Sequence, residues 1–232
     1  FSELGYWTYN FNEANYLAEL TEANPLPLRH LRELQSSLFT TTRMLVMVED
    51  LWTEALYYPG YLSWQTGFRY IARTLIDSGY TSAELYTTTW GDAGATSPNS
   101  TYHSKDTLIK LRKFIEAVLS YTGTRQVNII AHGMGVTLAR KVKKEELGDH
   151  IAGYYDLGNS IKQFVRLFVG IAGYNLGLPF CTPGPIVALC SNKDGFFPGT
   201  VLGTGLSQYL SDLNTRGGAE ADTVWSVWST DD

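Results

Sequence analysis

The sequence is poor in cysteine, in net positive charge and in long apolar runs, and each shortage excludes a class of protein. Two cysteines in 232 residues are too few for a cysteine-rich zinc site or a disulfide-dense scaffold. The formal net charge of −5 lacks the basic footprint of a nucleic-acid-binding protein, so we expect no nucleic-acid partner. Asp92, Asp106 and Asp194 are scattered along the chain, and we expect neither a metal site nor a cofactor.

Long apolar segments are equally scarce. No uninterrupted apolar run reaches the roughly 18 residues that a membrane-spanning helix needs. The nearest candidate, residues 167–190, is interrupted by Asn175, by prolines and by several glycines, so we expect no transmembrane segment. The first residues have neither the basic nor the apolar region of a signal peptide. The absence of an initiator Met suggests a processed or trimmed chain, which leaves secretion open.

What the sequence does contain is an alternation of short apolar runs with stretches of helical spacing. Hydrophobic residues make up 44% of the chain, enough for a sizeable core. The patterns predict strands over 44–48, 84–87, 126–130, 164–171 and 224–229, and helices over 68–76, 108–119 and 138–142. Ser104 and Gly123 are expected to begin and end the second helix. The order predicts the α/β class: a mostly parallel, twisted sheet with helices on both faces.

Residues 1–43 do not fit this alternation. They are rich in aromatic side chains and include a helical stretch around Leu31 and Leu34. We interpret them as an N-terminal aromatic-rich extension that packs on the main domain, which we place at residues 44–232. An equally open interpretation is that the extension holds a partner.

The segment that carries most functional information is Ala131-His132-Gly133-Met134-Gly135, between the third strand and the next helix. A strand, a sharp turn lined by small residues and a helix are the setting of a nucleophile elbow. In that setting the central residue is presented above the sheet edge, and the helix N-terminus supplies an amide for an oxyanion. A hydrolase needs Ser, Cys or Asp at the centre, whereas this chain has Gly133.

Several long phrases around this corner resemble the class 2 lipases, in the group of secreted nematode and bacterial lipases and esterases. The matching stretches are residues 78–92, 114–123, 127–141, 168–173 and 227–232. The resemblance covers roughly residues 44–232. It implies the α/β-hydrolase fold and, for the family, ester hydrolysis by a Ser, Asp and His triad.

The departures from that family fall at its catalytic positions. The family has Ala-His-Ser-Met-Gly at the elbow, so Gly133 replaces the nucleophile and can form no acyl-enzyme. The family also ends its first strand with Val-His-Gly, where this chain has Val48-Glu49-Asp50 followed by Leu51. By resemblance the oxyanion region comprises Met134, Glu49, Asp50 and Leu51. Two carboxylates there would oppose a developing oxyanion.

The rest of the triad is also affected. The family's acid position matches Asp232, with Asp231 as the neighbouring possibility. None of the four histidines follows the acid, so the domain is expected to lack the final strand and the catalytic His. A single engineered change, or a truncation, would explain only one of these three losses. Together they predict a natural loss of catalysis.

We therefore expect a secreted lipase-like pseudoenzyme, not an enzyme, that serves as a protein-binding, assembly or lipid-pocket scaffold. A protein partner or self-assembly is the expected interaction, and a lipid or ester is the ligand that the scaffold would otherwise retain. The alternative is an active or formerly active triacylglycerol lipase or carboxylesterase, seen as an inactivated or truncated chain.

Other signals agree with secretion. Cys181 and Cys190 flank a Pro-rich loop, and a disulfide between them, favoured over two free thiols, suits an oxidising compartment. Asn99-Ser100-Thr101 is an N-glycosylation acceptor in a polar loop, which predicts a glycoprotein. Phe196 and Phe197 are candidates for a binding rim, with ordinary packing or a protein contact as the other interpretation.

Two further expectations concern residues beside the elbow. The side chain of His132 should point away from residue 133, so we expect a packed or hydrogen-bonded structural role instead of a general base. The charged run at Lys141, Lys143, Lys144, Glu145 and Glu146 is expected to form a solvated helix end, with cations at the favourable terminus.

Overall fold

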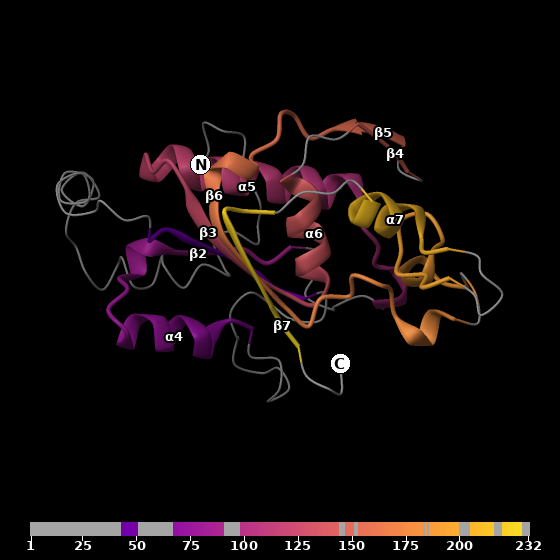
Figure 1. The fold of residues 1–232 in the computed structure, drawn as a ribbon, viewed down its shortest axis with the longest axis horizontal. Coiled ribbons are helices and arrows are strands. Elements are labelled where there is room, and N and C mark those ends of the chain that lie inside the picture. The colour runs from indigo at the N-terminus through magenta and orange to yellow at the C-terminus, as the bar shows by residue number, and fades with distance from the viewer. Residues whose placement is uncertain are drawn as a thin grey trace.

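The computed structural model describes residues 43–50, 67–90, 98–143, 147–150, 153–182, 184, 186–199, 205–215 and 220–228. The expected extension therefore lies outside the described residues, apart from Arg43. Within the described part, a parallel sheet runs through the middle of the molecule with helices on either side (Figure 1).

Five strands form the sheet in the order β2-β1-β3-β6-β7, and every neighbouring pair is parallel. Their bounds are β1 Leu45–Val48, β2 Leu85–Thr87, β3 Val127–His132, β6 Val165–Ile171 and β7 Thr223–Val227. All four residues of β1 are buried, as expected for a strand covered on both faces. The five strands predicted from the sequence are confirmed, with ends displaced by one or two residues.

The two faces of the sheet are covered by different helices, because side chains alternate along β1. Leu45 and Met47 point to a small cluster with Phe68 and Ala72 from the region of α4, Arg69–Asp77. Val46 and Val48 belong to the main core with α5, Lys105–Thr122, and α6, Met134–Val142. Figure 1 shows α4 on one side of the sheet and α5 and α6 on the other. The predicted α/β architecture with helices on both faces is thus confirmed.

The ends of α5 follow the local signals in the sequence. Ser104 precedes the helix, and its Oγ accepts a hydrogen bond from the Thr107 backbone N–H at 3.1 Å. Gly123 follows it in the left-handed region with φ 66°, and its N–H donates to the Leu119 carbonyl. Both caps were expected from the sequence, and each satisfies backbone groups that the helix leaves unpaired.

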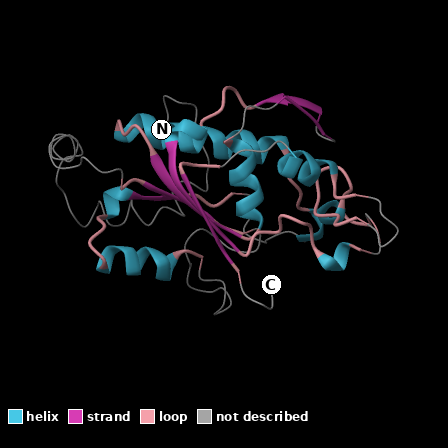
Figure 2. Ribbon diagram, viewed as in Figure 1, coloured by secondary structure: helices cyan, strands magenta, loops and turns pink. Residues whose placement is uncertain are grey.

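Several smaller elements were not predicted. A hairpin joins β4, Leu147–His150, to β5, Gly153–Asp156, as a separate two-stranded sheet. Helix α7 covers Gln208–Thr215 and packs on α6. Short 3-10 turns occupy Ser82–Glu84, Pro98–Ser100, Lys162–Phe164, Pro179–Cys181 and Ala188–Cys190. Figure 2 shows loops and short helices beside the sheet, and the colours of Figure 1 place most of them in the C-terminal half of the chain.

The charged run after the elbow does not form a fully solvated helix end. Lys141 and Lys143 are buried, at 0% and 1% exposure. The Lys143 Nζ lies 3.5 Å from the centre of the Phe168 ring and donates a hydrogen bond to the Glu220 carbonyl. The Lys141 Nζ lies 5.0 Å from the centre of the Tyr209 ring. The expectation of solvation is therefore wrong at these two positions, because groups from distant segments cover both side chains. Lys144, Glu145 and Glu146 lie outside the described residues.

Among the described strands β7 forms one edge of the sheet, and all five of its residues are exposed. Large apolar side chains at this edge include Val224, Trp225, Val227 and the following Trp228, with Trp228 70% exposed. In the part of the chain that is described, no helix is both long and apolar enough to pass through a bilayer.

Candidate functional site

The corner between β3 and α6 has the backbone of a nucleophile elbow. Gly133 stands between the two elements with φ 53° and ψ −127°, a conformation that costs a residue with a side chain of order 1–3 kcal/mol. Its N–H donates to the Ile171 carbonyl at 3.0 Å, which ties the turn to the end of β6. The residue is presented at the carboxyl edge of the central strand, where ligands bind in open α/β sheets.

The strand register brings the end of β1 to the same corner. Val48 pairs with Ala131, so Glu49 and Asp50 leave the sheet directly beside Gly133. The approach is so close that a Cβ on Gly135 would lie 2.5 Å from the Glu49 carbonyl oxygen, which explains the small residue there. The sequence prediction that Gly133, Met134, Glu49 and Asp50 belong to one site matches this placement. Leu51 lies outside the described residues.

Asp50 fills the space beside Gly133. Its Oδ1 accepts a hydrogen bond from the Met134 N–H at 2.8 Å, and its Oδ2 accepts one from the Tyr174 hydroxyl at 3.0 Å. An ideal Cβ on residue 133 would lie 2.5 Å from Oδ1 and 2.7 Å from Oδ2, far inside van der Waals contact. The carboxylate therefore occupies the volume that a nucleophile's side chain would need.

The Met134 backbone N–H lies at the position of an oxyanion donor. In a nucleophile elbow the N–H of the residue after the nucleophile is one of the oxyanion donors. Here that N–H points at Asp50, which is itself only 7% exposed. A negatively charged oxygen at a helix N-terminus is favourable, both for the hydrogen bond and for the helix dipole. The arrangement favours the resting carboxylate over a new oxyanion at the same place.

Glu49 and His132 form a second polar pair at this edge. The His132 Nδ1 lies 2.7 Å from the Glu49 Oε1, with the imidazole side chain 40% exposed and the carboxylate nearly buried. The Glu49 carbonyl accepts a hydrogen bond from the Trp90 indole at 2.7 Å, which holds this segment against the neighbouring strand. The expected hydrogen-bonded role of His132 is confirmed.

His103 is buried, at 1% exposure. Its Nδ1 lies 2.7 Å from the Asp194 carbonyl oxygen and its Nε2 lies 2.8 Å from the Thr137 Oγ1. Its ring stacks on Tyr209 with centroids 3.8 Å apart. These contacts use both ring nitrogens to join α5, α6 and the C-terminal loops. Sequence reasoning assigned no role to this residue, because its partners are distant in the chain.

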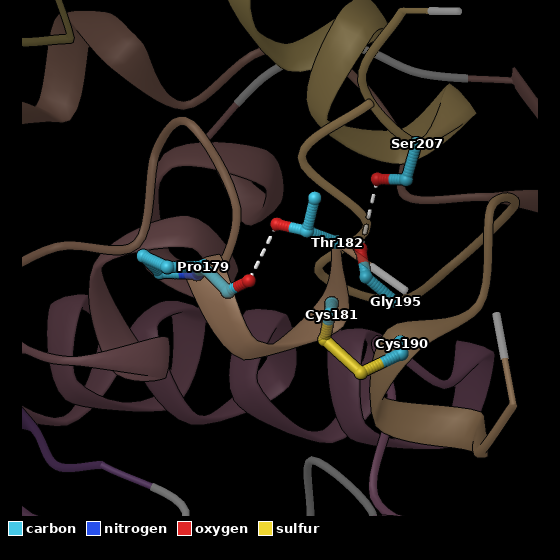
Figure 3. The surroundings of a disulfide bond; sticks show 6 residues. All are labelled: Pro179, Cys181, Thr182, Cys190, Gly195 and Ser207. Carbon is cyan, nitrogen blue, oxygen red and sulfur yellow. Dashed lines mark hydrogen bonds between the residues drawn. A yellow bond between two sulfur atoms is a disulfide. The ribbon is translucent and has the colours of Figure 1, made fainter. Parts of the chain in front are cut away.

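The predicted disulfide between Cys181 and Cys190 is present, with the two Cα atoms 5.1 Å apart. Figure 3 shows it closing a short loop, near the hydrogen bond from the Ser207 hydroxyl to the Gly195 carbonyl. Phe196 and Phe197, which were candidates for a binding rim, are 0% and 6% exposed. Their side chains pack in the interior, so they offer no exposed aromatic rim.

The remaining predicted positions lie outside the corner or outside the described residues. Asn99 is exposed, in the short turn Pro98–Ser100. Asp231 and Asp232, the expected acid positions, lie outside the described residues. Among the residues that are described, no group of three or more His, Cys, Asp and Glu side chains could hold a metal ion. A cleft of about 960 Å³ lies near the opposite, amino-terminal ends of β3 and β6, lined in part by Arg112, Arg125 and Phe164.

A parallel sheet whose central strand ends in such an elbow is of the α/β-hydrolase type. A model of the class 2 lipase family matches residues 60–232, well over half of the chain. The chain therefore belongs to the class 2 lipase family. A direct comparison with curated protein sequences gives no significant match.

Solved esterase structures are similar to this chain at low sequence identity. EstA from Clostridium botulinum is 15% identical with a TM-score of 0.41, over 62% of this chain and 39% of EstA. An acetyl xylan esterase is 12% identical with a TM-score of 0.42, over 81% of this chain and 83% of that one. Esterase Pf2001 from Pyrococcus furiosus is 11% identical with a TM-score of 0.40, over 81% and 74%. The match spans well under two thirds of EstA.

Proposed function

We propose that this chain is a secreted lipase-like pseudoenzyme: a class 2 lipase scaffold that does not hydrolyse esters and acts by binding. The observation that carries the proposal is Gly133 at the centre of the elbow with Asp50 against it. A residue without a side chain cannot form the acyl-enzyme on which triad hydrolysis depends. The donor amide next to it is already engaged by a carboxylate.

The direct test uses the native chain. We expect no turnover of short- or long-chain p-nitrophenyl esters above the rate in buffer, and no labelling by a fluorophosphonate probe, with an active serine esterase assayed in parallel. Ester turnover that the probe abolishes would overturn the proposal, because it would reveal an activated serine.

The alternative, a disabled form of a working lipase or esterase, makes a different prediction for Gly133→Ser. If only the nucleophile were missing, this reversion would restore activity. We expect no activity, because the new Cβ would meet the Asp50 carboxylate and the Met134 amide would stay engaged. Hydrolysis by Gly133→Ser alone would favour the alternative.

Binding to a protein is the role we propose for the scaffold. The apolar, exposed edge at β7 supports it, since large exposed apolar patches are typical of interaction sites. Secretion is supported by the Cys181–Cys190 disulfide and by the exposed position of Asn99. A shift in mass on treating the secreted protein with an N-glycosidase, lost in Asn99→Gln, tests the glycosylation and the compartment together.

A further inference from the structure

We propose that Asp50 is an internal ligand of the oxyanion site, so that its carboxylate holds the place that a substrate's carbonyl oxygen would take. This inference rests on the proposed function and deepens it. It gives two separate reasons why an ester is not hydrolysed. At Gly133 the attacking group is absent, and Asp50 occupies the space into which the ester would have to enter.

Two donors from different elements face the Asp50 carboxylate. The carboxylate accepts hydrogen bonds from the Met134 backbone N–H, 2.8 Å from Oδ1, and from the Tyr174 hydroxyl, 3.0 Å from Oδ2. One donor lies at the start of α6 and the other lies beyond the end of β6. Two convergent donors, one of them a helix N-terminal amide, are what stabilises an oxyanion in acyl transfer.

The Asp50 carboxylate also lies where the side chain of a nucleophile would stand. The ideal Cβ of residue 133 falls 2.5–2.7 Å from the two carboxylate oxygens, so these oxygens lie within the reaction space of an elbow. An ordinary helix cap comes from the residue that precedes the helix. That residue here is Gly133, which has no side chain and makes no side-chain cap. Asp50 supplies the carboxylate from 84 residues away, in the segment that follows β1.

The Asp50 carboxylate is also nearly buried. A nearly buried carboxylate is costly unless hydrogen bonds replace its hydration. At 7% exposure, Asp50 depends on the donors that face it. Removing the carboxylate while keeping the donors would therefore leave a site that is complementary to a small external carboxylate, such as formate or acetate.

The first experiment measures that complementarity by chemical rescue. The melting temperature of Asp50→Ala is followed in formate or acetate, against chloride at the same ionic strength. We expect a saturable rise of about 3 °C or more at ten times the dissociation constant, and no such rise for the native chain. The double variant Asp50→Ala/Tyr174→Phe should show a weaker response, because one donor is missing.

The matched control is Asp156→Ala. Asp156 is also a carboxylate that accepts a backbone N–H, from Gly158 at 2.7 Å, but it is exposed, so water replaces it. We expect no carboxylate-specific response from this variant. Equal responses to chloride and formate in Asp50→Ala, or the same formate response in Asp156→Ala, would overturn the inference.

The second experiment measures the reactivity of a cysteine introduced beside Asp50. The only two cysteines of the native chain are joined in a disulfide, so Gly133→Cys introduces a single reactive thiol. At a helix N-terminus a thiolate is stabilised, whereas a carboxylate beside it opposes its formation. We expect Gly133→Cys/Asp50→Ala to react with iodoacetamide at pH 7 at least about tenfold faster than Gly133→Cys.

Equal labelling rates for these two folded variants would also overturn the inference. If Gly133→Cys fails to fold, the rescue experiment decides alone. Neither measurement depends on ester turnover. The proposed function and the proposed role of Asp50 can therefore be rejected independently of each other. Hydrolysis by the native chain would overturn the proposed function, whereas absent rescue with absent turnover would overturn only the assignment of Asp50.

Discussion

The chemistry of the corner depends on two residues. Gly133 has no side chain, and the carboxylate of Asp50 lies beside it. Gly133 adopts φ 53°, which few residues with a Cβ tolerate, and Asp50 has taken the volume that a Cβ would enter. Either residue alone would weaken a hydrolase. The two features depend on each other, because the glycine leaves room for the carboxylate.

This coupling predicts the cost of Gly133→Ala. We expect the free energy of unfolding to fall by about 2–4 kcal/mol, from backbone strain together with displacement of Asp50 from its hydrogen bonds. Urea unfolding followed by far-UV circular dichroism measures it. The control is Gly123→Ala, whose φ of 66° is also positive but whose Cβ would meet nothing within 4 Å, and which should cost about 1 kcal/mol. Equal costs at the two positions would contradict the proposed clash.

Glu220 gives a second prediction at the residue scale. Burial raises its pKa, but the hydrogen bond and charge of Arg140, with Lys143 nearby, outweigh burial and bring the pKa below the ordinary value of 4.5. The Arg140 Nε lies 2.9 Å from the Glu220 Oε1. A carboxylate with a depressed pKa stabilises the folded state above its unfolded pKa, and this contribution is lost as the pH falls through the folded pKa.

The expected result is therefore a smaller acid dependence in Glu220→Gln. Above about pH 4.5 the native chain should be the more stable of the two, and the difference should shrink as the pH is lowered further. Unfolding free energies measured from pH 7 to pH 3 decide this. Parallel curves for the two proteins would show that the ion pair with Arg140 contributes nothing through its charge.

At the scale of elements, α5 is the clearest case of a helix whose ends are encoded locally. We expect Ser104→Ala to lower the free energy of unfolding by about 1 kcal/mol, because the Thr107 N–H loses its acceptor at 3.1 Å. Ser120→Ala is the matched control, since Ser120 is exposed within the same helix and should change stability by less than about 0.5 kcal/mol. Similar values for the two variants, from chemical unfolding, would argue against a capping role.

Local sequence patterns were sufficient to predict some helices and strands but not others. The strands and the helices α4, α5 and α6 were predictable because apolar spacing and caps are properties of neighbouring residues. The β4–β5 hairpin and α7 were missed. Helix α7 has only eight residues, and three of them, Tyr209, Leu210 and Leu213, are buried against distant segments. Its apolar pattern is too short to identify a helix before its packing partners are known.

For the whole molecule, the exposed edge at β7 is the feature that bears on binding. Trp225 and Trp228 are 63% and 70% exposed on a strand that, in the described part, has a neighbour only on the β6 side. Such edges pair with other chains unless they are charged or covered. We expect Trp225→Lys to weaken any concentration-dependent association that light scattering detects, relative to Tyr70→Lys on the distant α4, which is similarly exposed at 63%. Equal effects of the two changes would exclude this edge.

The sequence by itself determined the order of the five strands of the sheet and of helices α4, α5 and α6, together with the elbow, the family and the glycine at position 133. These are local properties: apolar spacing along a strand, small residues in a tight turn, and the identity of one residue within a motif. They also sufficed for the Cys181–Cys190 pair, because only nine positions separate the two cysteines.

Only the tertiary structure decided what occupies the corner. Glu49 and Asp50 were expected in the oxyanion region, but the contact of Asp50 with Met134 depends on the register of β1 against β3 and joins residues 84 positions apart. The burial of Lys143 over Phe168 likewise required distant segments to meet. From composition alone, charged side chains are expected at the surface. Whether a particular charged side chain is solvated depends on which groups the fold places next to it.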